Sequence, residues 1–330
     1  MPEKADVRPV DSTFAPAIAW LPTLSAPLSA LLALVLHELM SGSEPVAETR
    51  TYSIFLGVLL VLGLLLAALQ LPLVRLRSWL REMAPIVSMA ILILLALEAI
   101  TTGWRWLPLP YFPSPARVLR TIIDNRAMLW NSTWHSLILL VSGYALGVLV
   151  GFVSGVCIGW FKRARYWGMP ILKVIGPIPA TAWIPLALVL SPSAMLSAIG
   201  IIALAVWFPV TMLTASGISN TPASYLDVAR TFGASRAYLI FRVAIPAALP
   251  NIFLGLFMGL GTAFLTLIVA ETVGVKSGLG WYLSWSKEWA EYGKVYAALV
   301  IMAIFFSSVM TALFWVRDRV LVWQKGTIKW

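Results

Sequence analysis

The sequence predicts an all-α membrane protein, because it is too apolar for a water-soluble domain of its length. Sixty per cent of the 330 residues are hydrophobic and 12% are charged, whereas soluble domains carry about 25% charged residues. The apolar residues cluster in runs near 20 residues long, which matches a helix that crosses the roughly 30 Å hydrocarbon core. The alternating pattern of a membrane β-barrel is absent, and the high hydrophobicity excludes intrinsic disorder.

Eight apolar segments are candidate membrane spans, and they lie at 17–40, 52–74, 85–103, 132–160, 169–190, 194–216, 250–272 and 295–316. The first carries Pro22 and Pro27, which allows a tilted or re-entrant helix as well as a full span. The stretch 114–130 mixes apolar and charged residues, and it predicts an amphipathic helix on the outer membrane surface.

The distribution of Lys and Arg predicts that both termini are cytoplasmic. If all eight segments cross, fifteen Lys and Arg residues fall on the cytoplasmic side and eight on the outer side. The net charge of +10 therefore fits cytoplasmic loops better than nucleic-acid binding. Trp281, Trp285 and Trp289 form one helical stripe on the outer side, where an interfacial anchor is favoured over a docking surface.

The segment 132–160 contains a row of glycines spaced four residues apart, namely Gly143, Gly147, Gly151, Gly155 and Gly159. On a helix they form a bare ridge that lets a second backbone approach closely. Gly255 and Gly259 form a shorter ridge of the same kind. Both helices are therefore expected inside a bundle.

The segment 169–190 is rich in proline, with Pro170, Pro177, Pro179 and Pro185. Each proline removes a backbone donor, and the freed carbonyls must face protein or a water-filled cavity within a bilayer. A broken helix of this kind lines the pathway of many transporters, and a kinked packing helix is the alternative. The candidate pathway residues in this segment are Pro179, Ala180, Trp183 and Pro185.

A basic loop at 219–249 separates the sixth and seventh segments, on the predicted cytoplasmic side. Thr221-Pro222 favours a helix start, and Gly233 favours a left-handed helix end. Ser235 favours a second helix, which we expect to stop at Pro246. Two helices with a glycine turn also occur in DNA readers, but a loop tied between two spans would not enter a major groove. A short helix at the membrane surface suits the groove of a partner protein instead.

This loop resembles the EAA motif of binding-protein-dependent ABC importer permeases, whose pattern is Glu-Ala-Ala-x3-Gly-x9-Ile-x-Leu-Pro. In this chain Asp227-Val228-Ala229 is followed at the same spacing by Gly233 and then by Val243-Ala244-Ile245-Pro246, with Asp in place of Glu. The resemblance implies coupling to an ATPase for Asp227, Ala229, Arg230, Gly233, Ala234, Val243, Ile245 and Pro246.

Other segments resemble the branch of these permeases that serves nitrate, sulfonate, taurine and bicarbonate. They are Leu109-Pro110 with Pro113-Ser114-Pro115, Ile178 to Leu186, Ala270-Glu271, Gly278-Leu279-Gly280, and Arg317-Asp318-Arg319 leading to Trp323. The likeness implies a six-helix permease domain at 84–330. Residues 1–83 depart from the family pattern and predict an N-terminal extension with one or two membrane helices.

The resemblance implies an importer subunit for a small anion such as nitrate, bicarbonate, sulfonate or taurine. Its partners would be a second copy of this chain, two ATPase subunits that bind ATP and Mg, a periplasmic or lipid-anchored binding protein, and membrane lipid. The chain lacks the G-x-x-x-x-G-K-[ST] phosphate-binding pattern, so we expect neither enzymatic activity nor a cofactor on it. The alternative, an ion-gradient-driven secondary transporter, favours paired mid-membrane carboxylates and internal repeats, which the sequence lacks.

Ionisable residues within the predicted spans are candidates for function. Glu98 and Glu271 lie near predicted outer ends and Lys173 near an inner end, where each side chain can reach water. We add Glu271 to the pathway as a gating or hydrogen-bonding group, because a carboxylate would repel an anion. His37 and His135 have no partners at metal-ligand spacing and are treated as isolated.

Overall fold

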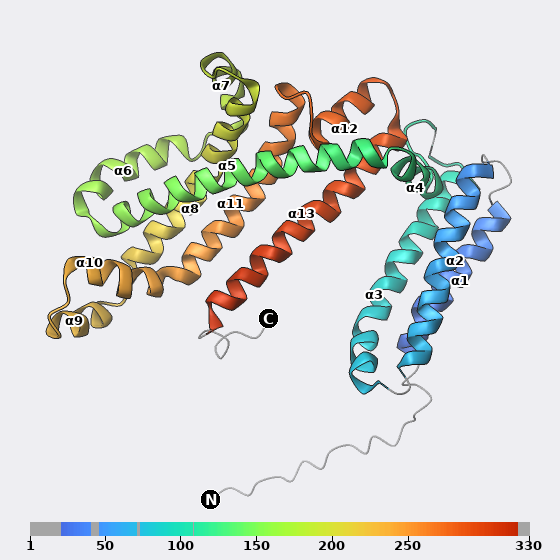
Figure 1. The fold of residues 1–330 in the computed structure, drawn as a ribbon, viewed down its shortest axis with the longest axis horizontal. Coiled ribbons are helices and arrows are strands. Elements are labelled where there is room, and N and C mark those ends of the chain that lie inside the picture. Colours follow the sequence, from blue (N-terminus) through green and yellow to red (C-terminus); the bar gives the residue numbers. More distant parts are fainter. Residues whose placement is uncertain (1–20, 41–45, 71–72, 108, 323–330) are drawn as a thin grey trace, which may run out of the picture. The chain divides into compact units, whose positions relative to one another are not determined.

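Residues 21–40, 46–70, 73–107 and 109–322 are described in the computed structural model of the chain (Figure 1). These residues contain helices and no β-strand. Seven of the helices are long and apolar enough to cross a membrane, and one bent helix pair can make an eighth span. Residues 17–20, residues 71–72 and Trp323, which the sequence analysis assigned to spans or to the family likeness, lie outside the described residues.

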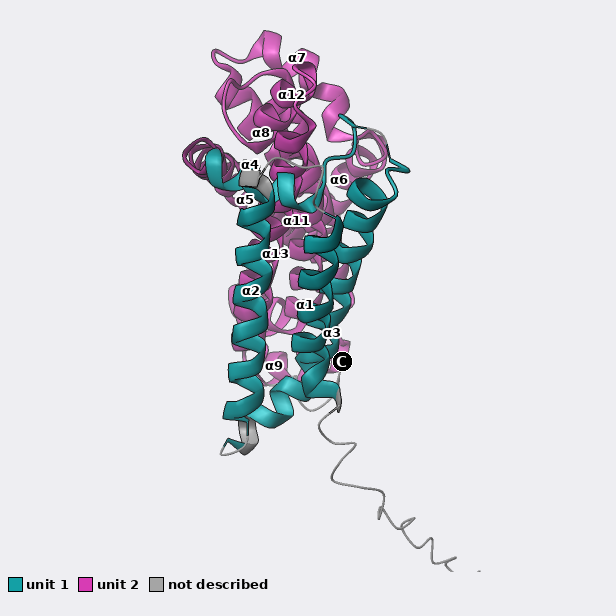
Figure 2. Cartoon of the chain, turned by 90° about the vertical axis from the view of Figure 1, so that its right-hand side faces the viewer, with its two compact units in different colours: residues 1–124 teal, residues 125–330 magenta. Residues whose placement is uncertain are grey.

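The chain divides into two compact units, residues 1–124 and 125–330, which are coloured separately in Figure 2. Unit 1 contains α1 (Leu21–Met40), α2 (Val46–Leu69), α3 (Val74–Glu98), the π-helical turn η3 (Ala99–Gly103) and α4 (Pro115–Asp124). α3 packs on α1 and thus belongs to unit 1 by its contacts, although the sequence places the start of the permease domain at residue 84.

α1 is a continuous helix, of the length expected for a full span, in spite of Pro27. It packs against both α2 and α3 through small residues, of which Ala30 and Ala33 are almost fully buried. Pro27 lies so close to α2 that a Cβ added at Gly63 would be 3.3 Å from the proline Cβ. Glycine therefore gives α1 and α2 room to approach each other.

Unit 2 holds the remaining elements: α5 (Arg126–Trp160), α6 (Lys162–Ile175), η4 (Ala180–Trp183), α7 (Ile184–Leu190), α8 (Ala194–Ser219), α9 (Ala223–Thr231), α10 (Arg236–Tyr238), η5 (Leu239–Ala244), α11 (Ile245–Val273), α12 (Leu279–Glu288) and α13 (Tyr292–Val320). The amphipathic helix expected at 114–130 is present as α4, but it ends earlier than expected. α4 ends at Asp124, Asn125 leaves the helical conformation, and α5 begins at Arg126 with Leu129 already buried.

α8 is the centre of unit 2 and packs between α5 and α11. The glycine ridge of α5 lies against α8, and a Cβ added at Gly147 would be 2.6 Å from the carbonyl oxygen of Ala203. Added at Gly155, it would be equally close to Thr214 Cβ. The predicted ridge is thus confirmed as a close helix contact, in which bulky side chains of α8 fill the groove that the glycines leave.

α9 and α10 lie at one end of α8 and α11, and α7 and α12 lie at the other end (Figure 1). The chain reverses direction between α5, the broken helix, α8, α11 and α13, so α13 also finishes at the α9 end. One end of unit 2 therefore carries the loop with α9 and α10 and the C-terminal end of α13. The opposite end carries α7 and α12.

Candidate functional site

The loop at the α9 end begins with a helix that has no buried residue. Tyr225 and Val228 are each 58% exposed, and Phe232 directly after the helix is 87% exposed. Asp227 and Arg230 form an ion pair of 2.9 Å on the same helix, and both side chains are exposed. α9 thus presents apolar and charged side chains together.

Gly233 ends α9 as predicted, with a left-handed φ of +79°. The Gly233 amide donates to the Arg230 carbonyl at 2.9 Å, and the Ala234 amide donates to the Ala229 carbonyl at 3.1 Å. This pair of bonds is the Schellman arrangement, which fixes the direction in which the chain leaves the helix. Ser235 then caps the next helix by accepting the Tyr238 amide, again as predicted.

The expectation that this second helix stops at Pro246 is wrong. α10 runs on through the π-helical turn η5 into α11, so that Arg236–Val273 is one long helical stretch. Pro246 lies directly after the π-helical turn η5, where the irregular hydrogen bonding of the helix accommodates the missing N–H. The start of α9 also falls one residue later than expected, because Pro222 is the cap and Ala223 the first helical residue.

The remaining motif residues lie where this continuous helix leaves the loop. Ala229 and Ala234 are half-buried on the inner side of the turn, and Val243, Ile245 and Pro246 are half-buried on the helix. The EAA-like residues therefore form one connected element, with an exposed helix at its tip and a rigid helical stem behind it.

The proline-rich segment forms a broken helix, as predicted. α6 and the pair η4–α7 meet at an angle of 85° across residues 176–179. Pro179 and Ala180 line an open cavity of about 390 Å³ whose other walls come from α8 and α11. Trp183 and Pro185 are outside its lining, and the indole nitrogen of Trp183 is buried without a hydrogen-bond partner.

The cavity wall contains hydroxyl groups and a proline-freed carbonyl, and none of its described lining residues is charged. Pro209 has no N–H for the Ala205 carbonyl four residues earlier. Thr262 of α11 donates its hydroxyl to that carbonyl instead, at 3.0 Å. Thr266 lies one turn further along α11 and also lines the cavity.

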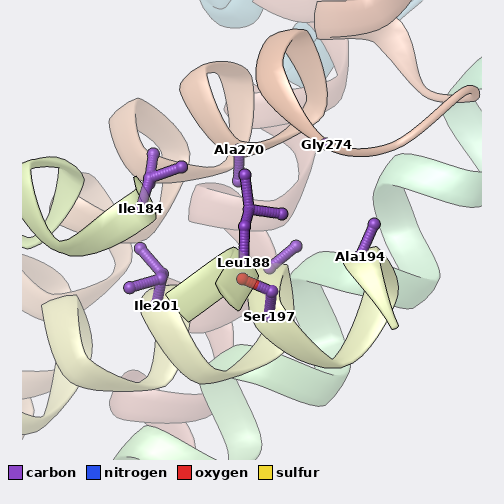
Figure 3. A pocket seen from close by; sticks show the side chains of 8 residues that line it. Ile184, Leu188, Ala194, Ser197, Ile201, Ala270 and Gly274 are labelled. Carbon is purple, nitrogen blue, oxygen red and sulfur yellow. The ribbon is translucent and has the colours of Figure 1, made fainter. Parts of the chain in front are cut away.

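A second, smaller pocket lies where α7 meets α8 and α11 (Figure 3). Its free volume is about 10 Å³, which is the space of one water molecule. Ser197 supplies the one hydroxyl among its lining side chains, which otherwise are apolar. This pocket is a packing joint that is too small for a substrate.

Glu271 is 1% exposed and lies outside the lining of both cavities. Its Oε1 accepts the Ser136 hydroxyl at 2.6 Å, and its Oε2 accepts the Gly280 amide at 2.7 Å. Ser136 in turn accepts the Leu279 amide at 2.9 Å. Glu271 thus links α11 and α5 to the first turn of α12, which is a hydrogen-bonding position; the expectation that its side chain reaches water is wrong.

A second buried carboxylate, Glu98 in unit 1, was not predicted from the sequence. The expectation that Glu98 reaches water and that His37 is isolated is wrong, because Glu98 is 1% exposed and its Oε1 contacts His37 Nδ1. The two residues are 61 positions apart on different helices, so no local spacing announces the contact. Lys173, in contrast, is exposed as expected.

Residues 143–321, which are more than half of the chain, match the family described as binding-protein-dependent transport system inner membrane component. The chain belongs to this family. It is thus an ABC importer permease, a multi-pass membrane component of a transport system and not a member of an enzyme family. Membership implies an ATPase and a substrate-binding protein as partners.

Several curated relatives are similar to this permease. A probable ABC transporter permease protein of Haemophilus influenzae is 32% identical over 170 residues, which are 52% of this chain and 69% of that protein. The bicarbonate transport system permease protein CmpB of Synechococcus elongatus is 29% identical, over 39% of this chain and 46% of CmpB. The taurine transport system permease protein TauC of Escherichia coli is 29% identical, over 43% of this chain and 54% of TauC.

Among solved structures, a chain of the MetNI methionine ABC transporter in inward-facing conformations has the same fold. The TM-score is 0.51 at 17% sequence identity, and the match covers 60% of this chain and 98% of that chain. At 17% identity this match shows that the two chains share a fold, and nothing further.

Proposed function

We propose that this permease imports a small anion and that α9 is the element through which ATPase subunits drive it. The observation that carries the proposal is the exposure of α9 and Phe232 at the tip of a loop held by a Schellman turn. A phenylalanine exposed by 87% in an aqueous loop is unfavourable unless a partner covers it. An amphipathic helix of this kind fits a groove in a partner protein.

The continuous helix behind the loop supports a mechanical role. Since the turn after α9 is held by two backbone hydrogen bonds and the stretch 236–273 is helical throughout, a displacement of α9 would be carried to α11. α11 carries Thr262 and Thr266 of the cavity wall. The coupling residues in this proposal are those of the EAA-like motif, from Asp227 to Pro246.

The cavity beside the broken helix is the proposed substrate pathway. Its rim includes Met258 and Leu265, which are 54% and 69% exposed on unit 2. A hollow with threonine hydroxyls and a proline-broken backbone is a poor surface for lipid. We propose that a second copy of the permease covers this face, so that the pathway lies between two copies.

The substrate class rests on the relatives, which include bicarbonate and taurine permeases. The hydroxyls of Thr181 and Thr266 in this wall can donate hydrogen bonds to an anion, and the absence of charge from the described lining residues keeps such binding weak enough for release. Glu271 acts beside this pathway as a link to α12 and not as a ligand. The proposed orientation places the α9 end and both termini in the cytoplasm, as positive charge predicts.

The first experiment is co-purification of the tagged permease from its native host in mild detergent. We expect an ATPase in equal amount, and we expect its loss in Phe232→Ala and Gly233→Asp, since a side chain at a left-handed turn distorts the docking helix. Trp289→Ala is the matched control, because this tryptophan is 69% exposed on the far end of unit 2.

An ATPase that remains bound and fully stimulated in Phe232→Ala would contradict the coupling assignment. Purification without any ATPase across several detergents would instead favour a gradient-driven carrier. The anion proposal is tested separately in proteoliposomes, where nitrate, bicarbonate or taurine should compete for uptake while an uncharged solute of equal size should not.

A further inference from the structure

Unit 1 buries a cluster of titratable side chains that the proposed transport mechanism does not use. His37 of α1, Tyr52 of α2 and Glu98 of α3 are 0%, 2% and 1% exposed. His37 Nδ1 contacts Glu98 Oε1, and the ring of Tyr52 packs edge-on against the imidazole with centroids 4.9 Å apart. These three side chains, one from each long helix of unit 1, therefore meet at one buried point.

The contacts of His37 determine how many protons the pair holds. Its Nε2 faces the carbonyl oxygen of Thr49 at 3.3 Å, and since a carbonyl only accepts, Nε2 carries a proton. The contact between Nδ1 and Glu98 Oε1 then requires one further proton, on the imidazole or on the carboxyl group. Both arrangements leave the pair neutral overall, which is the state that burial favours.

Two polar atoms of the cluster have no hydrogen-bond partner among the described residues. They are Oε2 of Glu98 and the hydroxyl of Tyr52, and both are buried. Glu98 is also the last α-helical residue before the π-helical turn η3, an irregularity that is frequent at functional sites. A carboxylate with a purely structural role has both oxygens paired as a rule, and Glu98 does not.

In the described part of the chain, the charged groups that act on His37 lie on α1 and α3. Glu98 and Glu38 are the charged groups that act on His37 within the described part of the chain, and both are acidic. From α2, the ring of Tyr52 packs against the imidazole of His37. On α4, Arg120 is engaged by Asp124 at 2.9 Å and by Thr51 at 3.4 Å instead of by the cluster.

We propose that His37, Glu98 and Tyr52 form a proton-binding site that links the packing of α1 on α3 to pH. When hydroxide removes the shared proton as water, the lone pair of Nδ1 faces a buried carboxylate and neither can donate. When a second proton binds from acid, an imidazolium faces a neutral carboxyl and a positive charge is buried. The packing of α1 on α3 is tightest when the pair holds one shared proton. It loosens when the pair loses this proton or binds a second one.

The test uses the full chain with ¹⁵N-labelled histidine, because His37 and His135 are the two histidines of the sequence. His135 is exposed and supplies the second histidine signal of the spectrum. We expect the His37 signals to stay constant between about pH 5 and pH 8, where an unperturbed imidazole changes its charge. A change of charge of His37 within this pH range would overturn the proposal.

Glu98→Gln separates the proton site from simple packing, because its amide can donate to Nδ1 without a titratable group. Backbone hydrogen exchange over residues 95–103 should rise several-fold in the wild type once the His37 signals change, and Glu98→Gln should remove this pH dependence. Equal exchange in both proteins at every pH would overturn the link to packing.

Tyr52→Phe tests the third member of the site. The tyrosine hydroxyl can donate to Glu98 Oε2 after the proton has left, so its removal should change the pH at which the His37 signals change. An unchanged release step would overturn the place of Tyr52 in the site. Retained elution volume of each variant in detergent establishes that the fold is kept.

Discussion

Each unit of the permease buries one glutamate near the end of a helix, and the two carboxylates have different surroundings. Glu271 in unit 2 accepts a hydrogen bond on each oxygen, from Ser136 and from the Gly280 amide. Glu98 in unit 1 has one oxygen against His37 and one without a partner. Burial alone therefore does not define the role of a carboxylate, since Glu271 is held by two donors and Glu98 keeps one oxygen without a partner among the described residues.

The two sites also differ in how tightly the backbone encloses them. Gly278 has a φ of +108°, and a Cβ added there would overlap the carboxylate of Glu271. Near Glu98, a Cβ added at Gly103 would meet only the flexible end of Met40, at 2.8 Å from its sulfur. The unit 2 site is rigid on the backbone side, and the unit 1 site has a neighbour that can move.

The largest expected effect comes from alanine at these two glycines. Gly278→Ala should destabilise the protein by about 3 kcal/mol, because it adds backbone strain to a steric overlap. Gly103→Ala is the matched control and should lower stability by less than about 1 kcal/mol, since a methionine can adapt. Thermal unfolding in mild detergent measures both, and equal losses would contradict the difference in rigidity.

A second test asks whether the scaffold around Glu271 is as closely packed as the glycine ridge indicates. Gly147→Ala should destabilise unit 2 by about 2 kcal/mol, because the added methyl group meets the backbone of α8. Gly200→Ala on α8 adds its methyl group to open space and should stabilise the helix by up to about 1 kcal/mol. A ridge variant as stable as the wild type would show that α5 and α8 can separate.

Replacement of each glutamate by glutamine, which has the same shape, compares the two buried carboxylates directly. In Glu271→Gln an amide N–H₂ replaces one of the two accepting oxygens and faces a donor, either the Ser136 hydroxyl or the Gly280 amide. This change should destabilise the protein by about 1.5 kcal/mol. In Glu98→Gln the amide can donate to His37 Nδ1, so the loss of stability should stay below about 0.5 kcal/mol. Unfolding midpoints at neutral pH give the answer, and the reverse order would remove the distinction between the two sites.

The smallest effect is expected at Tyr282 on α12, the helix that Glu271 holds. Burial, with a smaller effect of Glu291, raises the pKa of Tyr282 to about 12 from its usual 10. Because the unfolded chain loses this proton first, stability should be full below pH 10 and decrease as pH rises from 10 to 12.

Tyr282→Phe should remove this part of the alkaline decrease and leave stability at neutral pH almost unchanged, because the hydroxyl has no partner among the described residues. Unfolding midpoints measured between pH 9 and pH 12 provide the check. An identical alkaline decrease in Tyr282→Phe would assign it to other groups.

Much of the fold follows from local sequence signals. The apolar runs predict the spans, the prolines at 177 and 179 predict the break between α6 and α7, and Gly233 predicts the left-handed end of α9. The passage of the helix through Pro246 was not predictable in this way. A proline in the first turn of a helix and a proline that stops one leave similar patterns, and packing of η5 and α11 decides between them.

The candidate site divides in the same manner. The EAA-like spacing identifies the loop residues, and the structure adds the exposure of Phe232 beside them. Of the proposed pathway residues, Pro179 and Ala180 line the cavity, whereas Trp183, Pro185 and Glu271 are outside its lining. The hydroxyls of Thr262 and Thr266 were not predicted, because an isolated threonine in an apolar helix gives no signal of what it faces.

The sequence by itself determined that this protein is a helical membrane permease with a loop of EAA-like spacing, because span length, glycine spacing and turn residues are local properties. Only the tertiary structure decided which polar groups meet inside it. Ser136 and Glu271 are 135 positions apart, and His37 and Glu98 are 61 apart. Such contacts depend on how helices pack against each other, and the free energy of a buried charge depends on its final partners and not on its neighbours in the chain.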